Sequence, residues 1–385
     1  MTFSFTVYLF CVALAIANLV MAAVLLLAPR KARNRKANLT LILLLLCLAA
    51  SFFIGDILYR TSFFKRYPHL MEYDPFLTLC LGPLLYCYIL YQTRPDFRLR
   101  PRHLLHLLPL LIYFVLQWEF YTSDAAAKLA YIKQDWSTVP TRIIVASYLR
   151  EFQLFVYGVV CYRLLVRHGH VIRELASSIE DRQLRWLRNL LLMAAGLFAA
   201  WVITNEFGNI SDLLGFALLF FSYWVAYHAI SQEYIFAKVG AEAVLPIIQQ
   251  IEEGKEVRYR NSSLTPEDIQ GLMERLAAHM AQAKPYLDND LSLTALAEQL
   301  QLNPNHLSQV LNEGVGESFY KFVNRYRVEE SKRLLRDPAF AHYNMLGVAY
   351  QAGFNAKSTF YKAFKETVGC SPSEFAKNEH NSEYQ

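Results

Sequence analysis

The sequence contains no motif of the kind that holds a nucleotide, a catalytic nucleophile or a metal ion. It has no glycine-rich phosphate loop, no HExxH sequence and no nucleophile elbow. Its six cysteines show no metal-ligand spacing, and five of them lie in apolar stretches, which favours free thiols over a disulfide framework. We therefore expect a protein that is not an enzyme and that needs neither a cofactor nor a metal.

Charged residues are also scarce, above all in the first 230 residues. Across the chain 54% of the residues are hydrophobic and only 18% are charged. Seven apolar stretches are long enough for a helix to cross about 30 Å of hydrocarbon. They cover residues 6–28, 38–59, 76–92, 103–121, 142–166, 187–204 and 210–230. The sequence therefore predicts a seven-helix transmembrane bundle over residues 1–230.

The distribution of lysine and arginine predicts how this bundle is oriented. Alternate connections carry fifteen positive residues on one side and five on the other. Connections rich in positive residues stay in the cytoplasm. We therefore expect a protein of the bacterial cytoplasmic (inner) membrane, with its N-terminus outside and everything from residue 231 onward in the cytoplasm.

Some ionisable residues fall within the apolar stretches, where a charge is costly unless it faces a partner or a cavity. The connections predicted outside are short, so we expect a signal to act at or within the membrane. We hypothesise that Asp56, Arg150 and Glu151 line an outward-facing cavity for a small-molecule or membrane-derived signal. The alternative is that Arg150 forms a structural pair with a carboxylate on another helix.

An internal repeat lies near the end of the chain. The segment EGVGESFYKF, residues 313–322, recurs as ETVGCSPSEF, residues 366–375, with five identical residues. The offset of 53 residues marks a duplicated structural unit. Gly316 and Gly369 occupy equivalent positions, where a left-handed residue would end a helix.

The first copy has the pattern of two short helices joined by a tight turn. Ser292 is suited to cap the first helix, and the turn covers residues 301–303. Asn303 can cap the second helix, with Pro304 at its first position. The outer face of this second helix is expected to carry Asn305, His306, Ser308 and Gln309.

The second copy repeats this arrangement. Its first helix is expected from Asn344 to Ala352, with a break at Gly353 and a second helix starting at Asn355. The exposed residues expected on that helix are Lys357, Ser358, Thr359, Tyr361, Lys362 and Lys365.

Residues 318–335 join the two copies and contain neither proline nor glycine. As a helix these 18 residues span about 27 Å. Successive major grooves on one face of DNA are about 34 Å apart. Both second helices could therefore enter one duplex, with further basic charge from the joining helix at Arg325, Arg327, Lys332 and Arg333.

These segments resemble the AraC/XylS family of bacterial transcription regulators. The resemblance runs from LSLTALAEQLQLNPNHLSQVLNEGVGESFYKFVNRYRVEESKRLL to GVAYQAGFNAKSTFYKAFKETVGCSPSEF. It implies that the second helix of each copy contacts base edges, and that double-stranded DNA and RNA polymerase are partners. The residues that it places on the bases are Asn305, Ser308 and Gln309 in the first copy and Lys357, Ser358, Thr359 and Lys362 in the second.

A connector, residues 231–283, joins the two halves. Thr265 and Pro266 are suited to start a helix there, and its apolar stripe begins at Ile269. The stripe either packs on the first helix pair or forms the surface of a homodimer. We expect the connector to be followed by a DNA-binding domain over residues 284–378 and a disordered tail over residues 379–385.

Together these features predict an all-α protein that acts as a membrane-anchored DNA-binding transcription regulator, in contact with membrane lipids and sensing its signal through the membrane. One observation keeps another interpretation open. Residues 284–385 contain 11 Lys+Arg against 12 Asp+Glu, so the domain has no net positive charge. The alternative is a membrane sensor or transporter whose helical cytoplasmic domain binds a protein rather than DNA.

Overall fold

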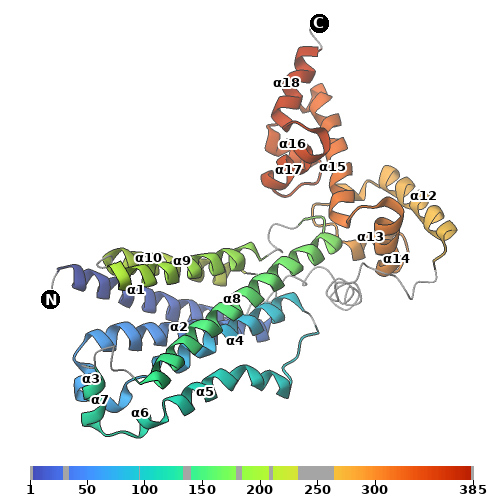
Figure 1. Cartoon of the computed structure of the whole chain (residues 1–385). Helices are drawn as coiled ribbons and strands as arrows, with labels where there is room; N and C mark the ends of the chain where they lie inside the picture. The colour runs from blue at the N-terminus through green and yellow to red at the C-terminus, as the bar shows by residue number, and fades with distance from the viewer. Residues whose placement is uncertain are drawn as a thin grey trace. The chain divides into compact units, whose positions relative to one another are not determined.

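The computed structural model describes residues 3–28, 34–94, 96–132, 140–178, 184–207, 211–232 and 264–382. All regular elements in these residues are helical (Figure 1), apart from one isolated antiparallel bridge between Ala176 and Ser292. The expected all-α class is therefore confirmed for this part of the chain. The chain forms two compact units. The N-terminal unit comprises Met1–Leu165 and Trp186–Tyr234, and the C-terminal unit comprises Val166–Arg185 and Ile235–Gln385.

The N-terminal unit is built from long apolar helices and short connecting ones. Its elements are α1 (Phe3–Leu26), α2 (Arg35–Phe52), the π-helix η1 (Phe53–Leu58), α3 (Phe63–Arg66), the 3-10 helix η2 (Pro68–Leu70), α4 (Asp74–Thr93), the 3-10 helix η3 (Pro101–Leu107), α5 (Leu108–Leu116), α6 (Trp118–Thr122), α7 (Ala125–Ile132), most of α8 (Thr141–Leu175), α9 (Arg185–Phe207) and α10 (Ser211–Ser231). α1 packs against α2 and α10, and α2 also packs against α4.

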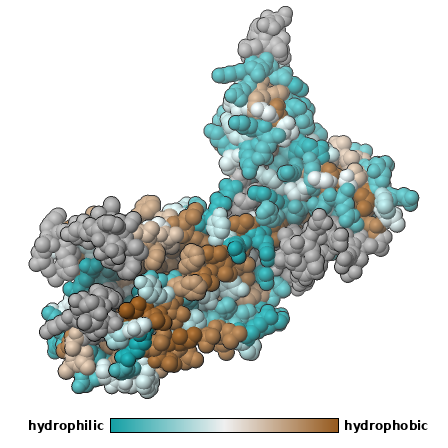
Figure 2. Space-filling view, viewed as in Figure 1, coloured by the Kyte–Doolittle hydropathy of each residue, from teal (hydrophilic) through white to brown (hydrophobic). Residues whose placement is uncertain are grey.

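Most described residues of the seven apolar stretches are helical, but Leu27 and Ala28 are not, and a turn at Gln117 interrupts the stretch 103–121. The helices also differ in length. Four of the described helical segments are long and apolar enough to cross a membrane, and these are Thr6–Leu26, Arg35–Leu58, Pro68–Thr93 and Thr141–Leu175. Pro101–Leu116 and Gly215–Ser231 are apolar but shorter. Figure 2 shows hydrophobic side chains gathered on the surface of the N-terminal unit. Four spanning helices are therefore supported, and a bundle of seven remains a prediction.

A proline within α4 determines one contact with α8. Pro83 has no N–H, so the carbonyl of Leu79 lacks its helical partner. The side chain of Gln153, which is buried on α8, donates to that carbonyl at 3.1 Å. Beside it, a Cβ atom on Gly82 would lie 2.6 Å from the ring of Tyr157. The two helices therefore approach closely, with the free carbonyl satisfied from across the contact.

We predict that Gln153→Leu destabilises the N-terminal unit by about 1–3 kcal/mol, because it leaves the Leu79 carbonyl buried without a donor. Thermal unfolding of the detergent-solubilised protein would measure this loss. In a Pro83→Ala background the helix regains its own N–H donor, so the same substitution should there cost clearly less. Equal losses in both backgrounds would contradict the assigned role of Gln153.

The C-terminal unit consists of shorter amphipathic helices. They are α12 (Pro266–Gln282), the 3-10 helix η6 (Pro285–Leu287), α13 (Leu293–Gln299), α14 (Pro304–Gln309), the π-helix η7 (Val310–Val315), α15 (Phe319–Arg336), the 3-10 helix η8 (Pro338–Phe340), α16 (Met345–Gln351), α17 (Lys357–Val368) and α18 (Pro372–Ser382). The expectation of a disordered tail from residue 379 was wrong for residues 379–382. They continue α18, and Glu379 there pairs with Arg336 at 2.6 Å.

Only part of the expected connector lies within the described residues, because residues 233–263 fall outside them. The remainder forms α12, whose start is as predicted. Thr265 caps it in a reciprocal arrangement with Asp268, and Pro266 is its first residue. The apolar stripe packs on the first helix pair, since a Cβ atom on Gly314 in η7 would lie 2.6 Å from Met273 and 2.9 Å from Ile269. A homodimer remains a prediction.

Candidate nucleic-acid interface

The C-terminal unit contains the two helix pairs that the repeat predicts. α13 and α14 form the first pair, α16 and α17 form the second, and α15 joins them. Ala297 and Ala349 are each at most 1% exposed, as expected of small residues where the helices of each pair meet. The core of the second pair contains Phe354, Phe360 and Phe364.

The ends of the first pair follow from its capping residues. The side chain of Ser292 accepts from the amide of Ala295, and that of Asn303 accepts from the amide of Asn305 at 2.9 Å. Pro304 begins α14. After η7 the chain turns at Gly316, which has a φ of 74°, and Gly369 ends α17 with a φ of 88°. These predicted starts and stops are confirmed.

In the second pair, the second helix, α17, begins later than predicted. Asn344 caps α16 as expected, but α17 starts at Lys357 with Ala356 at the cap position and no capping side chain. The start predicted at Asn355 was wrong by two residues, and the side-chain amide of Asn355 donates to Ser178.

Gly353, in the turn of the second pair, combines a positive φ with a very close contact. Its φ is 89°, and a Cβ atom there would lie 2.3 Å from the carbonyl oxygen of Tyr286. Gly369 has a similar φ of 88°, but a Cβ atom on it would have nothing within 4 Å. Both positions require a left-handed residue, and only Gly353 also requires the absence of a side chain.

α17 presents most of its predicted reading residues to solvent. Lys357, Ser358, Lys362 and Lys365 are exposed, whereas Thr359 is only 4% exposed and belongs to the core side. The prediction that Thr359 faces outward was therefore wrong. The lysines are weakly held, since Lys362 lies 3.9 Å from Glu366 and Lys357 lies 5.4 Å from the ring of Tyr361. Surface contacts of this kind contribute little and can be exchanged for a phosphate or a base.

The predicted reading residues on α14 are less exposed than those on α17. Asn305 and His306 are half-buried, and Ser308 and Gln309 are only 2% and 5% exposed. The expectation that Ser308 and Gln309 are free to contact bases is wrong for this conformation. Gln309 instead donates to Glu313 at 2.7 Å.

Three of the basic residues predicted to add charge along α15 form ion pairs with carboxylates of the C-terminal unit. Arg325 pairs with Glu317 at 3.1 Å, Lys332 with Glu329 at 2.8 Å, and Arg333 with Glu330 at 2.8 Å. The side chains of Arg325 and Arg333 are still 41% and 52% exposed, so their contribution to DNA binding remains a prediction. Glu330 is buried, which by itself raises its pKa, but hydrogen bonds from Arg333 and the nearby Lys284 lower the pKa below its usual value.

Arg327 is the most deeply buried of these basic residues, at 1% exposure. Its guanidinium donates to the backbone carbonyls of Tyr286 at 2.8 Å and Asp288 at 2.7 Å, and to the side chain of Asn324 at 3.2 Å. Burial lowers the pKa of Arg327 to about 10, and the charge of Asp288 partly opposes this shift. It therefore stays charged at neutral pH and acts as a structural cross-link rather than a DNA contact.

The residues proposed for the signal site lie in the N-terminal unit and are not brought together by direct contacts. Asp56 accepts from Tyr8 at 2.5 Å and lies 3.7 Å from Arg60. Arg150 and Glu151 are half-buried on α8. Among the residues described, no hydrogen bond or ion pair joins either of them to Asp56.

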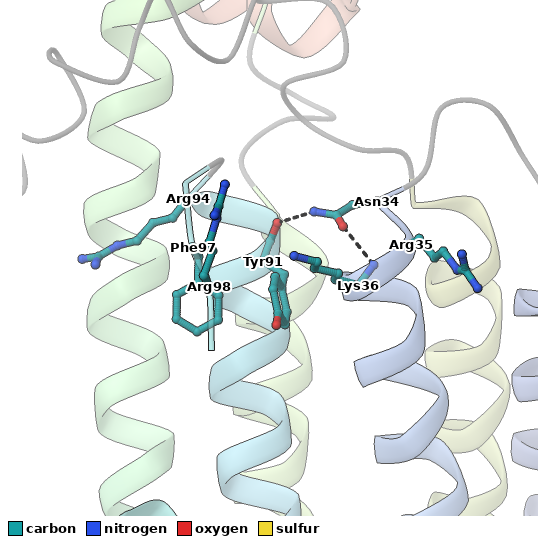
Figure 3. A pocket seen from close by; sticks show the side chains of 7 residues that line it. All are labelled: Asn34, Arg35, Lys36, Tyr91, Arg94, Phe97 and Arg98. Atoms are coloured by element: carbon teal, nitrogen blue, oxygen red, sulfur yellow. Dashed lines mark hydrogen bonds between the residues drawn. The ribbon is translucent and has the colours of Figure 1, made fainter. Parts of the chain in front are cut away.

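A pocket of about 370 Å³ lies where α2 starts and α4 ends. Asn34 ties these ends together by donating to the carbonyl of Tyr91 at 2.9 Å, and four basic residues line the space (Figure 3). Figure 3 also shows that Arg35 and Arg94 extend to opposite sides rather than toward one point. The basic residues are therefore not arranged as a convergent anion site.

Comparison with known proteins places the two helix pairs in a known domain type. Residues 296–378 match the family described as a helix-turn-helix domain. The C-terminal part of this chain is a helix-turn-helix domain.

Two relatives share this region. The HTH-type transcriptional regulator Rv1931c of Mycobacterium tuberculosis is 30% identical over 82 residues, which cover 21% of this chain and 30% of that protein. The uncharacterized HTH-type transcriptional regulator SACOL0084 of Staphylococcus aureus is 29% identical over 90 residues, which cover 23% of this chain and 12% of that protein. This chain therefore matches less than a third of either relative's length. No solved structure matches it.

We predict that Gly353→Ala destabilises the second helix pair more than Gly369→Ala does. A left-handed alanine costs roughly 1–2 kcal/mol at either position, and only Gly353→Ala adds a clash with the Tyr286 carbonyl. Hydrogen exchange of the α16 and α17 amides in the full-length protein would measure both effects. Equal protection in the two variants would show that the close approach at Gly353 is unimportant.

Proposed function

We propose that this protein is a membrane-anchored, sequence-specific DNA-binding transcription regulator of the AraC/XylS type. We call α14 and α17, the second helices of the two pairs, the first and second reading helices. The observation that carries the proposal is the exposed surface of α17. α17 projects the exposed side chains of Lys357, Ser358, Lys362 and Lys365 from the outer face of a duplicated helix-turn-helix domain. Lysine is suited both to phosphates and to the acceptor atoms of guanine in the major groove.

The membrane part of the proposal rests on the N-terminal unit. Its four spanning helices present large apolar side chains on their outer faces, including Phe152 and Phe155 of α8, which are 66% and 68% exposed. Contact between so much apolar surface and water is unfavourable, whereas contact with lipid chains is favourable. The unequal distribution of lysine and arginine supports a cytoplasmic location for the helix-turn-helix domain.

In this proposal a signal acts on the N-terminal unit and alters DNA binding by the C-terminal one. Asp56, Arg150 and Glu151 remain our proposed signal-site residues, and RNA polymerase remains a proposed partner. A signal can shift the protein between two states only by binding one of them more tightly.

We predict that Lys362→Ala weakens sequence-specific DNA binding by about 1–3 kcal/mol through loss of a base contact. The measurement is a mobility-shift titration with full-length protein and a site selected from random-sequence DNA. Lys377→Ala makes the same charge change at an exposed position on α18 and should have little effect. An equal loss on selected and random DNA would reassign Lys362 to a phosphate contact.

We predict that chromatin immunoprecipitation of the full-length protein enriches discrete promoter regions, and that Lys362→Ala reduces this enrichment. In parallel, protease added to intact spheroplasts should leave residues 284–385 uncut, because the topology places them inside. No enriched sites would count against gene regulation, whereas digestion from outside would count against the proposed orientation.

A further inference from the structure

The end of α8 belongs to the C-terminal unit, although most of this helix lies in the N-terminal one. α8 has 35 residues and is therefore about 52 Å long, well beyond the roughly 30 Å needed to cross hydrocarbon. Residues 166–178, which we name the α8 tail, begin at the boundary between the units. In the tail Val171, Ile172, Leu175 and Ala176 are at most 1% exposed.

The α8 tail is bonded to the centre of the helix-turn-helix domain through Ser177, which is fully buried. The amide and hydroxyl of Ser177 donate to the carbonyl of Leu291 at 3.2 and 2.7 Å. Arg327 donates to the carbonyl and hydroxyl of Ser177 at 3.3 and 3.0 Å. The guanidinium of Arg327 on α15 therefore bonds both the tail and the segment before α13.

The same tail also contacts both helix pairs. Glu174 accepts from Asn312 at 3.5 Å, and Asn312 lies in η7, directly after the first reading helix α14. Ser178 accepts from Asn355, immediately before the second reading helix. One short segment therefore bridges the two copies.

Asn312 lies on the outer face of the first helix pair, which the proposed function assigns to DNA contact. Leu307, Val310 and Leu311 face the core, so 3.6-residue periodicity places Ser308, Gln309 and Asn312 on the outer face. In this structure Ser308 and Gln309 are nevertheless almost wholly buried. Within the part of the chain that the structure describes, the buried side-chain oxygen of Gln309 accepts no hydrogen bond. Buried polar atoms without a hydrogen-bond partner are uncommon in folded proteins, so the burial of this oxygen requires an explanation.

We propose that the α8 tail is an intramolecular clamp that covers the first reading helix, and that binding of DNA by the first copy requires the tail to leave. This inference rests on the proposed function and concerns regulation of the same site. The second reading helix stays exposed in the clamped state. The clamped protein therefore contacts DNA through one copy, and the released protein through both.

Release leaves the helix-turn-helix domain intact, because Arg327 keeps its bonds to Tyr286, Asp288 and Asn324. After release, water can accept from the two N–H donors of Arg327 that bond Ser177 in this structure. The clamp is also continuous with a helix of the N-terminal unit. A shift of α8 along or about its axis therefore changes the tail directly, without an additional linker.

The test compares full-length wild type with Ser177→Ala/Ser178→Ala, reconstituted in nanodiscs without added signal. The double change is neutral in charge, and it removes the hydroxyls that bond Leu291, Arg327 and Asn355. We expect DNA affinity to rise about tenfold. Hydroxyl-radical footprints should lengthen by about one helical turn, as the first copy enters its groove. Ser147→Ala, on the same helix but in the N-terminal unit, is the matched control and should change neither quantity.

A second experiment holds the α8 tail against η7 with a covalent cross-link. In a chain depleted of its native cysteines, Glu174→Cys/Asn312→Cys is joined by a reducible thiosulfonate cross-linker. Cross-linked protein should give the short footprint, and reductant should restore the long one. Identical footprints before and after reduction, or no difference between the serine variant and wild type, would overturn the clamp. If none of these proteins selects a DNA sequence, the proposed function fails instead.

Discussion

The arrangement of the C-terminal unit depends on one buried cation. Arg327 is 1% exposed, and its guanidinium reaches the segment before α13, the joining helix and the α8 tail, with the ring of Phe354 at 5.9 Å. A buried charge is tolerated only when its donors are satisfied, and here carbonyl groups do most of this. Because those carbonyls belong to separate segments, satisfying the cation fixes the segments relative to one another. Arginine suits this role, since its five donors diverge in a plane.

The two helix pairs have the same architecture but differ in what covers them. Both have capped starts, a small residue at the helix crossing and a left-handed glycine after the second helix. Their predicted DNA-contacting faces nevertheless differ, because Lys357, Lys362 and Lys365 on α17 are exposed while Ser308 and Gln309 on α14 are buried. Duplication therefore preserved the internal packing of the unit, whereas the surroundings of each copy determine which face is available.

Local chemistry explains which predictions about the site were confirmed. Ser292, Asn303 and Gly316 act on backbone groups within a few residues, so their roles can be inferred from neighbouring sequence. Asn355 looked equally suited to start a helix, but it bonds Ser178, which is 177 residues away. Arg327 has the spacing of a surface residue but is buried, because backbone carbonyls from the segment before α13 and from the α8 tail accept its hydrogen bonds. Asn312 was missed, although its position four residues after Ser308 places it on the same face.

By itself the sequence determined the helical class, the helix-turn-helix duplication, most helix ends and the division into an apolar and an amphipathic half. These properties follow from periodicity and short-range capping, which need no knowledge of distant partners. Only the tertiary structure decided that the α8 tail packs with the helix-turn-helix domain, that Gln153 satisfies the carbonyl freed by Pro83, and that Ser308 and Gln309 on α14 are buried. Each depends on groups far apart in the chain, and exposure is a property of the folded surroundings rather than of residue type.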